Sequence, residues 1–240
     1  MNPPVILLAR AVAFFETAEL TPRTTIFPPD AVREILKQFQ FQKYPKNFEE
    51  WTADKGAEFL IGKYRDLVID KLLIWQTGIT VETKAGTTES RRFLEEILLW
   101  AKSTLGIAYE PDMIKHWAYV SSMVVHSDVP ILSTSPVERL AEKISSELGG
   151  ILGEPIQYLP AGMAIAHDPL ARKTGRAIFT ISRRADTPYS ENKYFSEAPL
   201  PTEVHFRLLE EFEADVRKQL TNLKHIKAGA YDPKQAIKID

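Results

Sequence analysis

The order of the predicted secondary-structure elements runs twice along the chain, and this repetition constrains the fold more than any other feature. Each half reads as a strand, a helix, further strands and a long helix. Helix starts at Pro29 and Pro136 lie 107 residues apart, and those at Thr88 and Thr202 lie 114 apart. Such self-similarity predicts two copies of one supersecondary unit. The two halves, and a C-terminal tail expected to be extended or mobile, then comprise residues 1–110, 111–224 and 225–240.

The helices are predicted from apolar stripes and from the residues that begin and end them. One long helix should begin at Thr87–Glu89 and end at Gly106, since glycine readily adopts the left-handed conformation after a helix. Ser135 is expected to cap another helix and Gly149–Gly150 to end it. The apolar stripe of that helix comprises Val137, Leu140, Ala141, Ile144 and Leu148. A last long helix should begin at Pro201.

The strands are predicted from short apolar or alternating runs. They cover residues 5–15, 58–65, 67–76, 79–84, 116–129, 156–166 and 176–184. Thr77–Gly78 is expected to form a two-residue hairpin turn, which would place residue 73 opposite residue 82. Tyr194 and Phe195 are expected to lie in a turn-rich loop that follows residue 186.

Two such halves predict an α+β fold. A single, mainly antiparallel sheet would carry the helices on one face and leave the other face partly open, because each amphipathic element must bury its apolar side.

Composition excludes several classes of function. The 240 residues include no cysteine, so disulfides, thiolate nucleophiles and Cys-ligated metals are ruled out. With 30 basic and 32 acidic residues, the net charge of −2 argues against a strongly basic nucleic-acid-binding protein. No apolar run is long enough to span a membrane. A cytoplasmic protein that makes no membrane contact is therefore expected.

The candidate catalytic residues are Asp70, Glu82 and Lys84. An acidic residue followed by Glu-x-Lys on a hairpin resembles the PD-(D/E)xK nucleases, in which carboxylates hold Mg²⁺ and the lysine stabilises charge at the phosphate. The resemblance implies a Mg²⁺-dependent nuclease. Alternation along the strands, however, turns Asp70 away from Glu82 unless a bulge intervenes. The alternative interpretation is a solvated Glu–Lys pair.

Two arginine pairs are the candidate binding residues. Arg91 and Arg92 lie at the start of a helix, and Arg183 and Arg184 end a strand. On one face of a sheet they could contact phosphates, so nucleic acid is a possible partner that the charge balance does not favour. His205, in the first turn of the last helix, is expected to be exposed.

No complete catalytic set is found, and the hypotheses follow from that. The first is a non-enzymatic cytosolic interaction protein that binds another protein or itself through an open sheet face or long helices, without a cofactor. The alternatives are the Mg²⁺-dependent nuclease and a small-molecule binder with a cleft between the halves.

Overall fold

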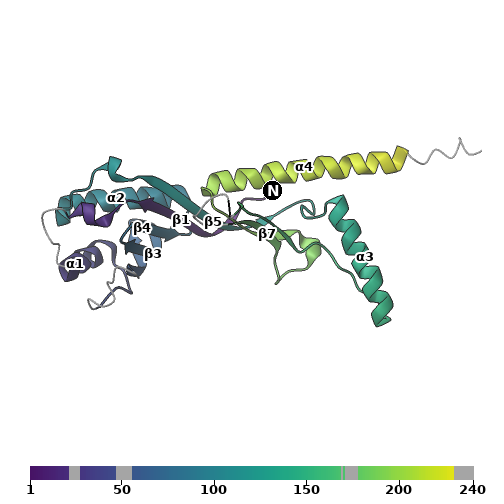
Figure 1. Ribbon diagram of the computed structural model, residues 1–240, viewed down its shortest axis with the longest axis horizontal. Coiled ribbons are helices and arrows are strands. Elements are labelled where there is room, and N and C mark those ends of the chain that lie inside the picture. The colour runs from purple at the N-terminus through teal and green to yellow at the C-terminus, as the bar shows by residue number, and fades with distance from the viewer. Residues whose placement is uncertain (22–27, 47–55, 169, 171–177, 230–240) are drawn as a thin grey trace, which may run out of the picture.

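The computed structural model describes residues 1–21, 28–46, 56–168, 170 and 178–229, and its centre is one eight-stranded sheet (Figure 1). The strands are β1 (Val5–Phe14), β2 (Ala57–Tyr64), β3 (Leu67–Trp75), β4 (Gly78–Thr83), β5 (His116–His126), β6 (Gly162–Ile165), β7 (Phe179–Arg183) and β8 (Lys193–Ala198). They are ordered β2-β3-β4-β1-β5-β8-β7-β6, and all neighbouring pairs are antiparallel. The predicted α+β class with a mainly antiparallel sheet is confirmed.

The strand order of the sheet is symmetric. From one edge to the centre the first half runs β2-β3-β4-β1, and from the other edge the second half runs in the corresponding order β6-β7-β8-β5. The helices are α1 (Pro28–Phe39), α2 (Thr87–Leu105), α3 (Ser135–Leu152) and α4 (Thr202–Gly229). Apart from short 3₁₀ turns, each half therefore runs strand, helix, three strands, helix. Kinship between the two halves stays a prediction.

The two long helices α2 and α4 pack on the same face of the sheet. Ala9 of β1 is in register with Thr83 of β4 and with Ser121 of β5, so these three side chains share a face. Ser90 of α2 donates a hydrogen bond to the Ala9 carbonyl, and His205 of α4 bonds to the Ser121 hydroxyl. The predicted arrangement of helices on one face is thus confirmed for this pair.

The N-termini of α2 and α4 cap each other. The Thr87 amide donates to Thr202 Oγ1 at 3.1 Å, and the Thr202 amide donates to Thr87 Oγ1 at 2.8 Å. The first amides of a helix have no partner within the helix, so a side chain must supply one. Here each helix supplies it to the other, and this reciprocal contact joins the two halves.

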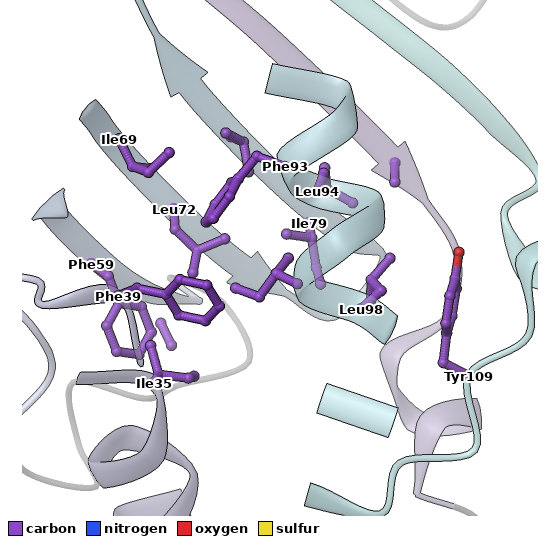
Figure 2. Close-up of a cluster of buried hydrophobic side chains, with 14 of the residues drawn as sticks. Ile35, Phe39, Phe59, Ile69, Leu72, Ile79, Phe93, Leu94, Leu98 and Tyr109 are labelled. Carbon is purple, nitrogen blue, oxygen red and sulfur yellow. The ribbon is translucent and has the colours of Figure 1, made fainter. Parts of the chain in front are cut away.

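The two halves bury cores of very different size. In the described residues, 18 side chains form the core of the first half and seven form that of the second. Figure 2 shows Phe93, Leu94 and Leu98 of α2 lying over the strands that carry Leu72 and Ile79. Burial drives folding in proportion to the apolar area removed from water, so the first half is the better-stabilised unit.

The register of the β3–β4 hairpin differs from the prediction. Trp75 faces Gly78 and Lys71 faces Glu82, so the turn consists of Gln76 and Thr77, and the predicted pairing of residues 73 and 82 is wrong. Gly78 is the first residue of β4. A Cβ at this position would come within 2.2 Å of the Ala13 carbonyl oxygen, so a larger residue does not fit. Close approach to β1, and not the turn, therefore requires this glycine.

Two helix ends also differ from the prediction. The N-cap of α3 is Thr134, one residue before Ser135. The helix continues through Gly149–Gly150 and ends at Gly153, whose φ of 71° is left-handed. Likewise α4 remains helical to Gly229. It therefore includes residues 225–229 of the tail, which were expected to be non-helical. Residues 230–240 lie outside the described residues.

The strands of the second half are shorter than predicted, and one was missed. Residues 156–161 are not part of β6, and residues 176 and 177 lie outside the described part of the chain. Tyr194 belongs to β8 and is fully buried, so its assignment to a loop is wrong. Every second residue of β8 is buried, namely Tyr194, Ser196 and Ala198. Because two of these are small and one of them is polar, the sequence shows no alternation of apolar and polar residues there.

Candidate functional site

The α3 helix projects away from the sheet at the end of the molecule opposite α1 (Figure 1). Val137, Leu140, Ile144 and Ile151 recur at helical spacing and share one side of α3. Their exposed fractions are 45%, 58%, 38% and 75%. We call these four residues the α3 stripe. An amphipathic helix ordinarily packs its apolar side against the rest of the protein. In α3, these four side chains instead face solvent.

Local interactions explain why α3 forms and how it is held. Pro136 lies in the first turn, where a missing N–H costs nothing, and the Gly153 amide closes the C-terminus by donating to the Gly149 carbonyl. The Ser145 hydroxyl accepts a hydrogen bond from the Tyr158 amide at 2.7 Å. Since Ser145 lies about 100° around the helix from Ile144, the loop attaches to α3 beside the stripe and leaves the stripe open.

A second exposed apolar position lies on α4. Counted from the helix starts at Thr87 and Thr202, Leu208 of α4 corresponds to Phe93 of α2. Phe93 is 1% exposed, and its ring packs edge-on against Phe39 of α1 at 5.4 Å. Leu208 is 38% exposed. The position that α1 covers in the first half is therefore open in the second.

The edge of the sheet in the second half is open on the face that carries α4. Ile165 of β6 is in register with Phe179 of β7, whose ring contacts the His205 ring of α4 at 5.8 Å. Ile165 thus lies on the face that carries α4, and it is 62% exposed. We call Leu208 and Ile165 the uncovered face.

Exposed apolar side chains are concentrated in the second half. The described residues include 18 large apolar side chains that are exposed, and 12 of them belong to residues 111–224. Exposed apolar side chains that are concentrated in one region of a protein mark a candidate interaction surface. The second half is therefore the candidate interaction surface.

The predicted nuclease residues are separated by the sheet register. Glu82 lies opposite Lys71 on one side and Arg10 on the other, and Arg10 Nε donates to Glu82 Oε1 at 2.8 Å. Asp70 precedes Lys71 on β3, so by strand alternation its side chain belongs to the opposite face of the sheet from Glu82. Lys84 lies beyond the end of β4 and is exposed. Among the described residues, no group of three or more His, Asp or Glu could hold a metal ion. The nuclease and its Mg²⁺ stay a prediction.

Replacing Glu82 or Arg10 by glutamine should lower the free energy of unfolding by a similar amount, about 0.5–1 kcal/mol. Each change breaks the same partly exposed ion pair, whose net contribution is small. Urea denaturation measures this effect. A nuclease would instead lose Mg²⁺-dependent plasmid cleavage in Glu82→Gln and keep it in Arg10→Gln, which would make Glu82 a metal ligand.

The first arginine pair lines a hollow where the halves meet. Arg91 and Arg92 border a space of about 390 Å³ together with Tyr119 and Pro201. The Arg91 guanidinium lies 4.7 Å from the centre of the Trp117 ring. The ion-pair partners of Arg91 and Arg92 are Glu95 and Glu89. These carboxylates already neutralise the arginines, and an anion-binding role stays a prediction.

The second arginine pair lies at the end of β7 with other neighbours. Arg183 is held 4.6 Å from the centre of the Tyr189 ring and donates to the Pro160 carbonyl. Arg184 forms two hydrogen bonds to the Asp186 carboxylate. Both arginines therefore support the local loop structure, and binding through them stays a prediction.

His205 is fully buried, and the expectation that it is exposed is wrong. Its Nδ1 and Nε2 each lie 2.8 Å from a serine hydroxyl, those of Ser121 and Ser196. Burial lowers the pKa of His205 to about 4, because desolvation disfavours the charged ring. A serine beside a histidine resembles a nucleophile–base pair, but all three side chains are inaccessible to substrate. The spacing of His205 and Leu209 along one helical face was the available signal.

Within the described residues, no helix has both the length and the apolar character needed to cross a membrane. No model of a known protein family matches the chain, and no curated protein sequence is similar to it.

Proposed function

We propose that this protein is a non-enzymatic, cytosolic interaction protein that assembles with a second copy of itself through α3. The observation that carries the proposal is the presence of two exposed apolar surfaces, the α3 stripe and the uncovered face. The absence of cysteine is in keeping with a reducing cytosol.

The first half of the chain indicates how the two surfaces fit. There, α1 places Phe39 against Phe93 of α2 and joins the core that covers the sheet. In the second half, the corresponding position of α4 is Leu208, and α3 points away from it. In the assembly, α3 of each copy occupies the uncovered face of the other, which is an exchange of identical elements about a twofold axis.

Burial of the α3 stripes is the driving force of the exchange. Each copy contributes four apolar side chains that are 38–75% exposed in the single chain. Removing such surface from water favours association in proportion to the apolar area buried. We therefore expect dimerisation that is detectable at concentrations between about 1 and 100 μM.

Replacing Ile144 by glutamate should weaken the dimer at least tenfold, because it places a charge within the buried stripe. Sedimentation equilibrium between about 1 and 100 μM measures the change. Ser146→Glu is the matched control: it adds the same charge to the same helix, at an exposed residue outside the stripe. Its dimer should be as stable as that of the wild type.

A second variant distinguishes the exchange from a simple α3–α3 contact. Leu208→Glu alters the uncovered face and leaves α3 intact, so it should also dissociate the dimer. Mixed with Ile144→Glu, it should form a heterodimer with one intact α3 contact. A wild-type protein that is monomeric at 100 μM would overturn the proposal, and so would a Leu208→Glu variant that dimerises normally.

A further inference from the structure

The first half contains an apolar pocket of about 360 Å³, distinct from the surfaces described above. Its base is formed by Leu72 and Ile79 of the sheet, and one wall by Ile97, Trp100 and Ala101 of α2. The remaining walls come from α1 and from the 3₁₀ turn η1 (Thr17–Leu20). Four elements of the first half thus border one half-open space beside its core.

The chemistry of the lining defines what could bind. Of the 15 described residues that line the pocket, none is charged and most are aliphatic. Among the hydroxyls, that of Thr17 already donates to the Gln76 carbonyl at 2.9 Å. A charged group placed there would lose its hydration without gaining a partner. The pocket therefore selects against ions and in favour of uncharged, apolar molecules.

The size of the pocket, which is open to the surface on one side, suits a small organic molecule. Ligand pockets in proteins typically measure about 300–1,000 Å³. An apolar cavity of roughly 150 Å³ suffices to bind benzene. By that measure a pocket of about 360 Å³ accommodates about a dozen carbon atoms. Leaving such a space empty forfeits contacts that a bound hydrocarbon would restore.

We infer that the first half binds an uncharged, apolar small molecule in this pocket, with Trp100 at its wall. The ligand class is a neutral hydrocarbon chain or ring of about ten carbons. This site does not depend on self-association, because α3 and the uncovered face contribute no residue to it.

The experiment uses n-decanol as the probe and titrates it into the 240-residue protein by calorimetry. We expect saturable binding with one site per chain, and at least tenfold weaker binding of decanoate, which has the same chain length and a negative charge. Ala101→Phe fills the pocket and should weaken decanol binding at least tenfold. Thr104→Phe adds the same ring to an exposed position of the same helix, outside the pocket, and should bind decanol normally.

Ala31→Phe fills the pocket from α1 and is a second test should Ala101→Phe fail to fold. Equal binding of decanol by the wild type and by a folded pocket-filling variant would overturn the inference. So would decanoate binding as tight as that of decanol, or no saturable binding of either. Sedimentation of the same samples reports dimerisation separately, so failure of one proposal is distinguishable from failure of the other.

Discussion

Replacing His205 by alanine should lower the free energy of unfolding by about 3–4 kcal/mol, a large part of the stability of a domain. The change removes a fully buried ring and with it the partner of the Ser121 hydroxyl, while the Ser196 hydroxyl keeps only its bond to the Thr180 carbonyl. A cavity and unsatisfied buried polar groups both destabilise, and here they act together. Because His205 joins β5 and β8 to α4, the second half should lose most.

Urea denaturation followed by circular dichroism measures this loss. His126→Ala is the matched control, since that histidine is exposed at the end of β5, and we expect a change within about 0.5 kcal/mol. A His205→Ala variant as stable as the control would show that the Ser–His–Ser contact contributes little to the fold.

The same histidine should make stability depend on pH. Its pKa is about 4 in the folded protein, below the ordinary 6.5, because burial disfavours the protonated ring. Below pH 6.5, His205 therefore binds a proton in the unfolded chain that it does not bind in the native protein. Stability should be complete above pH 6.5 and fall as the pH is lowered towards 4, by up to about 3 kcal/mol. His205→Gln, which cannot titrate, should remove about one proton from the pH slope in this window.

Replacing Glu213 by alanine should lower the free energy of unfolding by about 3 kcal/mol. This buried carboxylate on α4 accepts hydrogen bonds from the Ser127 hydroxyl at 2.6 Å, the Asp128 amide at 2.9 Å and the Met1 amine at 2.7 Å. Its loss leaves several donors unsatisfied, one of them charged. Chemical denaturation measures the change, with Glu210→Ala, exposed on the same helix, as the control.

The pH window of Glu213 differs from that of His205. Burial by itself raises the pKa of Glu213, but the hydrogen bonds from Met1, Ser127 and Asp128 outweigh it and hold the pKa below 4.5. Its contribution to stability is present above pH 4.5 and is lost as the pH falls through the lower, folded-state pKa. The difference in unfolding free energy between the wild type and Glu213→Ala should therefore shrink below that pH. A difference that stayed constant would contradict this account.

Local sequence predicted the elements whose signals lie within a few residues. Threonine with a following glutamate marks the starts of α2 and α4, and Gly106 ends α2 with the left-handed φ of 71° that glycine adopts readily. The short apolar run from Val5 predicted the central strand β1, in which Ala9, Ala11, Val12 and Ala13 are buried. These signals predicted the fold class.

Partners far apart in the sequence decided the features that were missed. The burial of His205 depends on Ser121, 84 residues away, and on Ser196 in a strand with no apolar pattern. The hairpin register depends on the approach of Gly78 to the Ala13 carbonyl. The Gly78 contact leaves no trace in the periodicity of its own segment. The helical spacing of His205 and Leu209 indicates a shared face but not what covers it.

The candidate site shows the same division. The periodicity of α3 was visible in the sequence, and it determined that the helix has an apolar stripe. Only the tertiary structure decided that Val137, Leu140 and Ile144 of this stripe face solvent while Ala141 is buried. In the first half, by contrast, α1 packs against Phe93. Periodicity specifies which side chains share a face. What covers that face depends on the path of the whole chain, because burial is a property of neighbours brought together from distant positions.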